Sequence, residues 1–331
     1  MKTIEVEKTG GPEVLTLQDI GGLEPPSPGQ ALVRIVMAGV NFMDVSQRRG
    51  TSPRETPFTP GLEAAGVVEA VGDGVKDVKP GDRVAYTGEP GAYAEASLVQ
   101  ADRLIPLPDD ISFEQGAAFP LQGMTAHYLI HEFRQPVPGD FVLVHAAAGG
   151  VGLLLVQWAK HLGAFVIGTV STEEKARMAL EAGADDVILY TQKDFAAETY
   201  RLTNGHGADI IFDSVGKSTC KKDFEAVAPC GHIIVFGASS GPADPISPHA
   251  LSGKSISLSA GSLANFISTR EDLLRRAEGV IQGIREGWLT LHIDRVLDLA
   301  EATEAHRLLE NRETSGKILL APPADVRSQA A

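Results

Sequence analysis

The segment from Phe141 to Trp158, FVLVHAAAGGVGLLLVQW, constrains the fold more than any other part of the chain. It begins with four apolar residues, Phe141–Val144, as expected for a strand that is buried on both faces. A glycine-rich turn follows, and the apolar run Leu153–Lys160 is long enough for a helix. A strand, a glycine turn and a helix in this order predict a phosphate-binding site, because the helix N-terminus presents unpaired N–H groups and the positive end of its dipole.

The glycines of this turn have different roles. Gly149 lets the backbone approach a pyrophosphate, and Gly152 lets the helix pack closely on the strand. Ala147 stands where the dinucleotide fingerprint usually has its first glycine. A nucleotide-hydrolase loop is excluded because Leu153 follows Gly152 where that loop needs a lysine. A membrane span is not expected, since the glycines interrupt the apolar run, and a turn without a ligand remains the alternative.

Composition narrows the class of protein. A chain of 331 residues predicts two domains. The net charge of −14 disfavours nucleic acid and anionic membranes as partners. The two cysteines, Cys220 and Cys230, are too few for a disulfide framework or a cysteine-rich zinc site. No apolar leader follows Met1-Lys2, so we expect a cytoplasmic protein.

Residues 1–124 predict short strands separated by turns. Ala31–Val36 and Gly66–Val71 have the composition of strands, and a Pro-Gly-Asp turn precedes a third strand at Arg83–Tyr86. Many short strands with this punctuation are typical of a partly open β-barrel.

From residue 125 onward, strands and helices alternate. This alternation predicts an α/β fold with a doubly wound parallel sheet and right-handed crossovers. We expect the tail from about Val296 to return to the first domain, with a last strand at Lys317–Leu320. The other expected strands are Phe165–Val170, Asp186–Tyr190, Asp209–Val215, His232–Phe236 and an edge strand at Ser255–Ser259; the expected helices are Thr125–Glu132, Thr172–Ala182, Asp194–Thr203, Ser218–Val227 and Glu271–Glu286.

The second strand of this series indicates which dinucleotide binds. An NAD site usually places an acid at the end of that strand to bind the ribose hydroxyl, but no acid lies between Gly163 and Thr172. Ser171 and Glu174 have the spacing of a capping box. Lys175 follows, either as part of a solvated helix face or as a partner for a 2′-phosphate. The missing acid and the nearby cation favour NADPH over NADH.

Two further patterns offer other chemistries. Residues 237–241, GASSG, match the nucleophile elbow of serine hydrolases, but the prolines that follow cannot start the required helix promptly. A hydrolase that uses Ser239 is therefore a weak alternative. His127 and His131 lie four residues apart on an expected helix, where we interpret them as a packed or solvated pair and not as metal ligands. His145 is interpreted as a core or turn histidine.

Three motifs carry a family resemblance: VNFMD at 40–44, PGLEAAG at 60–66 and HAAAGGVG at 145–152. Together they resemble the quinone oxidoreductases of the zeta-crystallin type, in the medium-chain dehydrogenase/reductase superfamily. The resemblance covers nearly the whole chain. It implies a GroES-like catalytic domain at 1–124, a Rossmann NADP-binding domain at 125–265, and a C-terminal helix and return to the catalytic domain at 266–331.

The resemblance also bears on metal binding and on the site. In zinc alcohol dehydrogenases of this superfamily, the positions of Asn41 and Leu62 hold a cysteine and a histidine ligand, so the resemblance implies an enzyme without a metal. Asn41 is the candidate for a catalytic role. Relatives often carry tyrosines where this chain has Ser46 and Ser52, which leaves the proton donor open. The cofactor-binding residues implied are Asn41 and Thr125 near the nicotinamide; Gly149, Gly150, Val151 and Gly152 at the pyrophosphate; Ser171, Lys175 and Tyr190 around the 2′-phosphate; Phe236, Gly237 and Ser239 beside the nicotinamide ribose; and Lys317 near the cofactor.

We therefore expect NADPH-dependent, zinc-independent reduction of quinones by hydride or electron transfer, in a dry cleft between the domains. Reduction of α,β-unsaturated carbonyls is the alternative, and a nucleotide-binding protein without turnover is a third class. Tyr190 is also consistent with a core aromatic at a strand end. The uncharged alternation of Ser255–Ser259 predicts a homodimer that pairs this edge strand.

Overall fold

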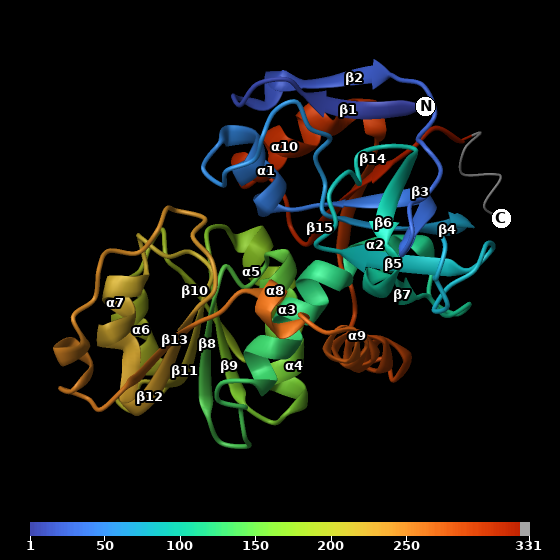
Figure 1. Cartoon of the computed structure of the whole chain (residues 1–331). Helices are drawn as coiled ribbons and strands as arrows, with labels where there is room; N and C mark the ends of the chain where they lie inside the picture. The colour runs from blue at the N-terminus through green and yellow to red at the C-terminus, as the bar shows by residue number, and fades with distance from the viewer. Residues whose placement is uncertain (325–331) are drawn as a thin grey trace. The chain divides into compact units, whose positions relative to one another are not determined.

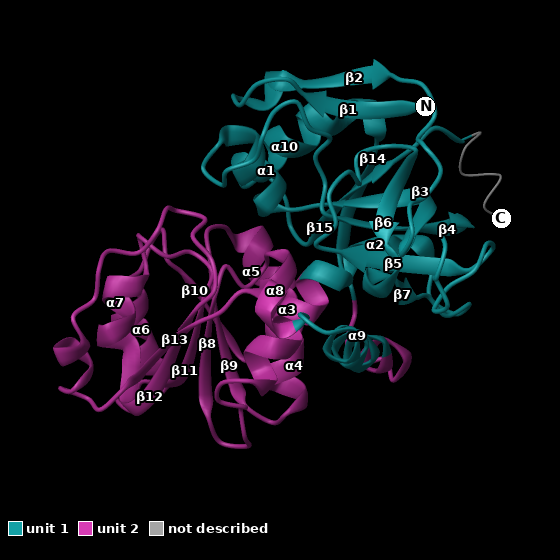
Figure 2. Ribbon diagram, viewed as in Figure 1, with its two compact units in different colours: residues 1–121, 267–281, 291–331 teal, residues 122–266, 282–290 magenta. Residues whose placement is uncertain are grey.

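The computed structural model describes residues 1–324, and its helices and strands are labelled in Figure 1. The chain divides into two compact units, which Figure 2 colours separately. Unit 1 comprises residues 1–121, 267–281 and those from 291 onward, and unit 2 comprises residues 122–266 and 282–290.

Unit 1 is built on a mixed seven-stranded sheet with the strand order β14-β15-β3-β4-β5-β7, and β6 pairs with β3. The strand-and-turn pattern predicts a partly open barrel for this part of the chain, and the family resemblance implies a GroES-like domain. The sheet comprises β3 (Gln30–Val40), β4 (Glu63–Val71), β5 (Arg83–Thr87), β6 (Ala96–Gln100), β7 (Ile105–Pro106), β14 (Ile293–Asp298) and β15 (Lys317–Ala321). A separate hairpin pairs β1 (Lys2–Val6) with β2 (Leu15–Asp19). The α-helices with most of their residues in unit 1 are α1 (Phe42–Arg49), α2 (Phe113–Ala118), α9 (Arg270–Arg285) and α10 (Ala302–Glu310), and 3₁₀ turns occur at Pro12–Val14, Ala101–Arg103 and Leu299–Glu301.

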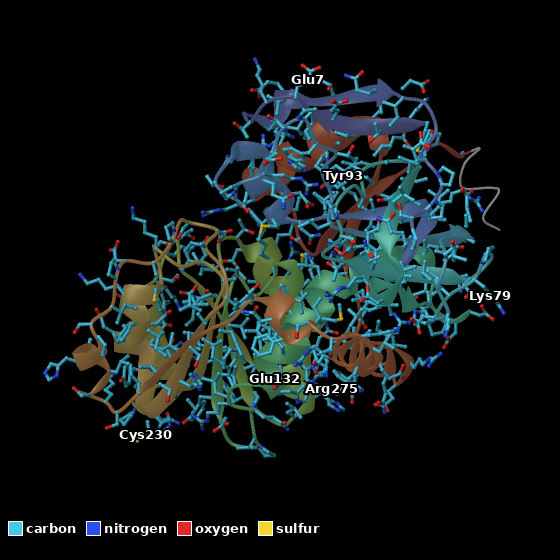
Figure 3. All side chains as sticks on the ribbon, in the orientation of Figure 1. Glu7, Lys79, Tyr93, Glu132, Cys230 and Arg275 are labelled. Atoms are coloured by element: carbon cyan, nitrogen blue, oxygen red, sulfur yellow. The ribbon has the colours of Figure 1, made fainter. Side chains whose placement is uncertain are left out.

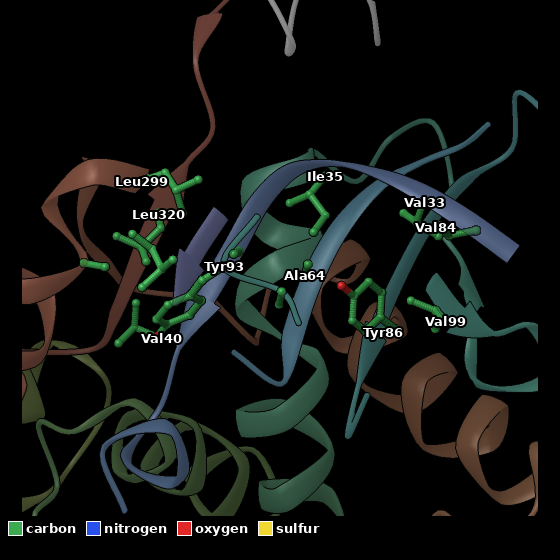
Figure 4. Close-up of a cluster of buried hydrophobic side chains, with 14 of the residues drawn as sticks. Val33, Ile35, Val40, Ala64, Val84, Tyr86, Tyr93, Val99, Leu299 and Leu320 are labelled. Carbon is green, nitrogen blue, oxygen red and sulfur yellow. The ribbon is translucent and has the colours of Figure 1, made fainter. Parts of the chain in front are cut away.

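The C-terminal strand of this sheet brings distant residues to one place. β15 runs antiparallel to β3, with Ile318 opposite Val40. This register places Lys317 next to residue 41, where β3 ends and α1 begins. Apolar side chains of both strands form the core of the unit, and Figure 4 shows Val33, Ile35, Val40 and Leu320 in this cluster with the buried ring of Tyr93. The polar residues at the end of β3 are therefore held on a well-packed base.

Unit 2 has a six-stranded sheet in which every pair of neighbouring strands is parallel, with the order β10-β9-β8-β11-β12-β13. The order reverses between β8 and β11, which confirms the doubly wound fold and makes the carboxyl ends of these strands the ligand-binding edge. The strands are β8 (Phe141–His145), β9 (Phe165–Val170), β10 (Asp186–Leu189), β11 (Ala208–Asp213), β12 (Val227–Val235) and the expected edge strand β13 (Ser257–Ala260). The helices are α3 (Pro120–His131), α4 (Gly150–His161), α5 (Glu173–Glu181), α6 (Phe195–Leu202), α7 (Cys220–Ala226) and α8 (Leu263–Phe266), with a 3₁₀ turn at Pro248–Leu251.

The apolar run at residues 141–158 is explained by this sheet. β8 lies between β9 and β11, and Val142, Leu143 and Val144 are fully buried. Among residues 1–324, none of the helices combines the length and the hydropathy that a membrane span requires.

Candidate functional site

The glycine turn between β8 and α4 has the geometry of a phosphate-binding turn. Gly149 is the N-cap of α4, so the free N–H groups of the first helical turn follow it directly. A Cβ at Gly152 would overlap the carbonyl oxygen of Ala146, so only glycine fits there. Ala146 itself adopts a left-handed conformation with φ of 50°. The backbone therefore reverses direction at Ala146. This is one residue before Ala147, which occupies the position of the usual first glycine.

Ala147 is accommodated by a second glycine on the neighbouring strand. Its side chain is fully buried, and its Cβ lies 2.8 Å from the place where a Cβ on Gly168 of β9 would be. The alanine thus fills space that Gly168 leaves open. This exchange explains how the turn retains its shape without the usual first glycine.

The segment after β9 carries the residues expected at the 2′-phosphate. The predicted capping box of Ser171 and Glu174 is wrong: Thr172 is the N-cap of α5, and its Oγ1 accepts a hydrogen bond from the backbone N–H of Lys175 at 3.2 Å. The helix begins one residue later than that spacing suggested, because Thr172 adopts the extended conformation of a cap. Tyr190, just after β10, is 42% exposed, so it is not the core aromatic that the sequence also allowed.

The loop after β12 contains the remaining residues expected near the nicotinamide. The nearest atom to a Cβ on Gly237 would be the Ser214 carbonyl oxygen, 2.5 Å away, so the loop packs directly on the segment that follows β11. The Ser214 carbonyl oxygen also accepts the backbone N–H of Ser239 at 3.3 Å. No helix follows Ser239 before the 3₁₀ turn at Pro248–Leu251, so this serine lacks the helix that a nucleophile elbow requires.

Helix α3 holds the last expected cofactor residue of unit 2. Thr125 is buried on this helix with an exposed fraction of 8%. On the same helix, His127 and His131 have ring centroids 4.6 Å apart, and both pack edge-on against Trp158. The two histidines are thus a packed aromatic group.

In unit 1, Asn41 belongs to a buried cluster that only partly matches the sequence interpretation. Lys317 Nζ donates a hydrogen bond to Asn41 Oδ1 at 2.7 Å and also forms an ion pair with Glu63 Oε2. Asn41 Nδ2 donates to Glu63 Oε2 at 2.9 Å and to the Gly39 carbonyl oxygen at 3.4 Å. Asn41, Glu63 and Lys317 are all at most 4% exposed. The sequence suggested Lys317 as a basic residue near the cofactor, whereas the structure gives it these two buried partners.

A second buried network anchors the start of α1. Asp44 Oδ2 accepts the backbone N–H of Asn41 at 2.8 Å, so Asp44 is the N3 residue of a capping box at the start of α1. The same oxygen accepts the hydroxyl of Tyr93 at 3.0 Å, and Tyr93 Oη lies 3.1 Å from His306 Nε2. Burial raises the pKa of Asp44 to about 7 and lowers the pKa of His306 to about 3. Sequence reasoning missed Tyr93 and His306, because neither belongs to a motif.

Of the two serines that stand where relatives often carry tyrosines, Ser46 lies within α1 and Ser52 lies in the loop that follows it. Ser46 Oγ donates to the carbonyl oxygen of Phe42 at 3.0 Å within α1. The Ser46 carbonyl oxygen accepts the backbone N–H of Ser52 at 3.1 Å. The Ser46 hydroxyl therefore has its hydrogen-bond partner within α1.

The residues at the zinc position of the superfamily do not fit zinc. Asn41 and Leu62 supply neither a thiolate nor an imidazole, and the oxygens of Asn41 and the neighbouring Glu63 already bind the Lys317 ammonium. Among the described residues, one group could in principle hold a metal: Asp213, Cys220 and Asp223, whose ligand atoms lie within 4.8 Å of one another. The other cysteine, Cys230, is exposed, and Figure 3 labels it near β12, far along the chain from the glycine turn.

Comparison with known proteins agrees with this geometry. The alcohol dehydrogenase GroES-like domain matches residues 27–109, and the zinc-binding dehydrogenase family matches residues 150–278. A quinone oxidoreductase of Pseudomonas aeruginosa is 41% identical over 324 residues, which cover 97% of this chain and 99% of that protein. A 2-haloacrylate reductase of Burkholderia sp is 39% identical over 328 residues, which cover 96% of this chain and 98% of that protein.

Solved structures give the same result. The crystal structure of Escherichia coli quinone oxidoreductase complexed with NADPH superposes with a TM-score of 0.94 at 38% sequence identity, and covers 97% of this chain and 100% of that chain. The fold, the two matching domain families and these relatives agree with the motifs. The chain therefore belongs to the quinone oxidoreductases, the zinc-free type of the medium-chain dehydrogenase/reductase superfamily.

Proposed function

We propose that this protein reduces quinones with NADPH and without a metal. The observation that carries the proposal is the cluster of Asn41, Glu63 and Lys317, in which the Lys317 ammonium binds Asn41, the residue that replaces a zinc-ligating cysteine of the superfamily, and Glu63. A site without a Lewis acid depends on its cofactor for the redox chemistry. NADPH, when bound, supplies the hydride or electrons, and one proton from solvent completes the conversion of a quinone to a hydroquinone.

The cofactor is held mainly by unit 2 in this proposal. The N-terminus of α4 binds the pyrophosphate through its free N–H groups, and Lys175 binds the 2′-phosphate at the end of the acid-free strand β9. The full proposed set is Asn41, Thr125, Gly149, Gly150, Val151, Gly152, Ser171, Lys175, Tyr190, Phe236, Gly237, Ser239 and Lys317. Lys317 belongs to this set because it donates a hydrogen bond to Asn41.

The role of Asn41 follows from its hydrogen bonds. Both of its amide hydrogens are used, one by Glu63 and one by the Gly39 carbonyl oxygen, and its oxygen accepts from Lys317. A side-chain amide fixed in this way orients what lies against it but does not donate a proton. We therefore assign Asn41 a positioning role and assign the proton to solvent.

A second acceptor class is favoured by one comparison. The 2-haloacrylate reductase that is 39% identical to this chain acts, as its name states, on an α,β-unsaturated acid derivative. We propose α,β-unsaturated carbonyl compounds as the alternative acceptors. In that reaction, hydride goes to the β-carbon and a solvent proton goes to the α-carbon.

The test is NADPH oxidation, followed by its absorbance, with a panel of ortho- and para-quinones and of enones. We expect turnover with quinones, a preference for NADPH over NADH, and the same rate after treatment with a chelator. A panel that leaves NADPH unoxidised throughout contradicts the reductase assignment. A stoichiometric metal whose removal stops turnover contradicts the metal-free mechanism.

We also propose a cytoplasmic homodimer. The edge strand β13 (Ser257–Ala260) carries no charged side chain and pairs with β12 on one side only among the described residues, so its other side is open to a second copy. Sedimentation equilibrium at micromolar concentration tests this proposal, and a monomer would contradict it.

A further inference from the structure

A chain of buried polar side chains lies at the carboxyl ends of three strands of unit 2. His145 ends β8, Thr169 lies near the end of β9, and Asp213 ends β11, while Asp223 comes from α7. His145 Nδ1 lies 2.8 Å from Thr169 Oγ1, and His145 Nε2 lies 2.8 Å from Asp223 Oδ1. All four side chains are at most 1% exposed, so none of them is in contact with bulk water.

Asp213 has the hydrogen-bond pattern of a carboxylate. Its Oδ1 accepts the backbone N–H of Val215 at 2.7 Å and of Gly216 at 3.1 Å, and the Thr219 hydroxyl lies 2.9 Å from both of its oxygens. Because two N–H groups and a hydroxyl face Asp213, we assign it the acceptor role toward the next group in the chain.

Asp223 is the group that faces it. Asp223 Oδ2 receives no hydrogen bond from any N–H or O–H group of residues 1–324, and a carboxyl oxygen of Asp223 lies within 4.8 Å of a carboxyl oxygen of Asp213. Two carboxyl groups can share a hydrogen bond only when one of them carries a proton. A proton on Asp223 would give its Oδ2 a hydrogen bond to Asp213 and would remove the repulsion between two buried carboxylates.

We propose that Asp223 is a neutral carboxylic acid, and that the chain Thr169–His145–Asp223–Asp213 positions the segments that bind NADPH. The hydroxyl of Thr169 donates to His145 Nδ1, and His145 Nε2–H donates to Asp223 Oδ1. Asp223 Oδ2–H then donates to Asp213, so that every buried donor and acceptor of the chain is used. The alternative, an imidazolium beside a carboxylate, would leave two negative carboxylates facing each other in a buried place.

The pKa directions agree with a retained proton. Burial raises the pKa of Asp223 to about 6, although His145 acts against this, and the Asp213 carboxylate raises the pKa further. Although burial alone would lower it, the pKa of His145 is raised by the adjacent Asp223. The pair of His145 and Asp223 therefore keeps a proton that the two isolated groups would release. The nearby Asp213 determines which of the two groups carries that proton.

This chain connects the segments proposed to bind the cofactor. His145 precedes the left-handed Ala146 that opens the glycine turn, and the Thr169 carbonyl oxygen accepts the backbone N–H of Ala147 at 3.1 Å. The Asp213 carbonyl oxygen accepts the backbone N–H of Phe236 at 2.9 Å, at the start of the 236–239 loop. The pyrophosphate turn, the 2′-phosphate strand and the nicotinamide-ribose loop are thus fixed against each other. The inference rests on the proposed cofactor residues.

Two substitutions at Asp223 test the proposal. Asp223→Asn keeps an acceptor for His145 and places an N–H donor toward Asp213, so it reproduces the neutral acid. Asp223→Leu removes both bonds at similar volume. We expect NADP⁺ affinity, measured by calorimetric titration at about pH 6, to stay within about twofold of wild type for the Asn variant and to fall at least about tenfold for the Leu variant. His206→Gln, at an exposed histidine that bonds Asp209, is the matched control and leaves the affinity unchanged.

Each other outcome overturns the proposal. An Asn variant as weak as the Leu variant shows that a carboxylate is required, either for an ion pair or for a metal at Asp213, Cys220 and Asp223, which elemental analysis of the protein distinguishes. A folded Leu variant with wild-type affinity shows that the chain positions nothing. If the Leu variant does not fold, the infrared band of a protonated carboxyl group decides: it must be present in wild type and absent in the Asn variant. NADP⁺ binding is measured without an acceptor, so a failed quinone assay leaves this result intact.

Discussion

Asp44 and His306 give unit 1 two opposite pH dependences that nearly cancel. The pKa of Asp44 is raised from 3.8 to about 7, so the folded state holds a proton that the unfolded state loses above its own pKa. Because the unfolded state releases this proton at a lower pH than the folded state, Asp44 lowers the free energy of unfolding as the pH rises from about 4 toward 7. The pKa of His306 is lowered from 6.5 to about 3, so the unfolded state binds a proton first, and stability falls as the pH drops below 6.5.

The magnitudes follow from these values. One pH unit is worth about 1.4 kcal/mol for each such group. From pH 5 to pH 7, Asp44 therefore costs about 3 kcal/mol of stability. From pH 5 to 6.5, His306 restores about 2 kcal/mol, so these two groups leave the wild-type stability nearly level.

The substitution Asp44→Asn removes the Asp44 contribution, so that the pH dependence of stability due to His306 can be measured. Asparagine replaces the protonated acid at equal size, so only the His306 contribution remains. Between pH 5 and pH 8, we expect the difference in stability between the variant and wild type to grow by about 3 kcal/mol in favour of the variant. His306→Gln is expected to change in the opposite direction by about 2 kcal/mol.

The assay is amide hydrogen exchange of β3 and β15, which reports the opening of unit 1 separately from unit 2. His206→Gln in unit 2 serves as the control and keeps the wild-type dependence. The reasoning is refuted if Asp44→Asn follows the wild-type curve between pH 5 and pH 8, because Asp44 would then ionise normally in the folded state.

Three other predictions concern the cofactor turn and the buried lysine. Gly152→Ala is expected to weaken NADPH binding by at least about tenfold, since its Cβ would overlap the Ala146 carbonyl oxygen, and fluorescence titration checks this. Lys175→Ala is expected to reduce the preference for NADPH over NADH by about tenfold in kcat/KM, because about 1.4 kcal/mol of phosphate binding is lost; an unchanged preference would exclude this lysine from the 2′-phosphate site. Lys317→Met is expected to destabilise unit 1 by about 3–5 kcal/mol, because Glu63 would be left as an unpaired buried charge, and adding Glu63→Gln should recover most of the loss in urea unfolding.

The alternation of strands and helices could be read from the sequence because it is local. The apolar run at 141–144 and the glycines after it determine a buried strand, a turn and a helix, since their causes lie within a few residues of one another. The absence of an acid at the end of β9 could be read from the sequence for the same reason. The capping residue of α5 could not be predicted, because Ser171 and Thr172 are both good caps and only the backbone conformation decides for Thr172.

The polar clusters could not be predicted, because they join residues that are distant in the chain. Lys317 and Asn41 are 276 residues apart, and they meet only because β15 pairs with β3 in one register. His145 and Asp223 are 78 residues apart and meet across the carboxyl ends of a parallel sheet. The sequence alone determined which chemical groups are present and which segments fold locally. The tertiary structure decided which of these groups share a buried site, because burial and strand register together select their partners and set their charge.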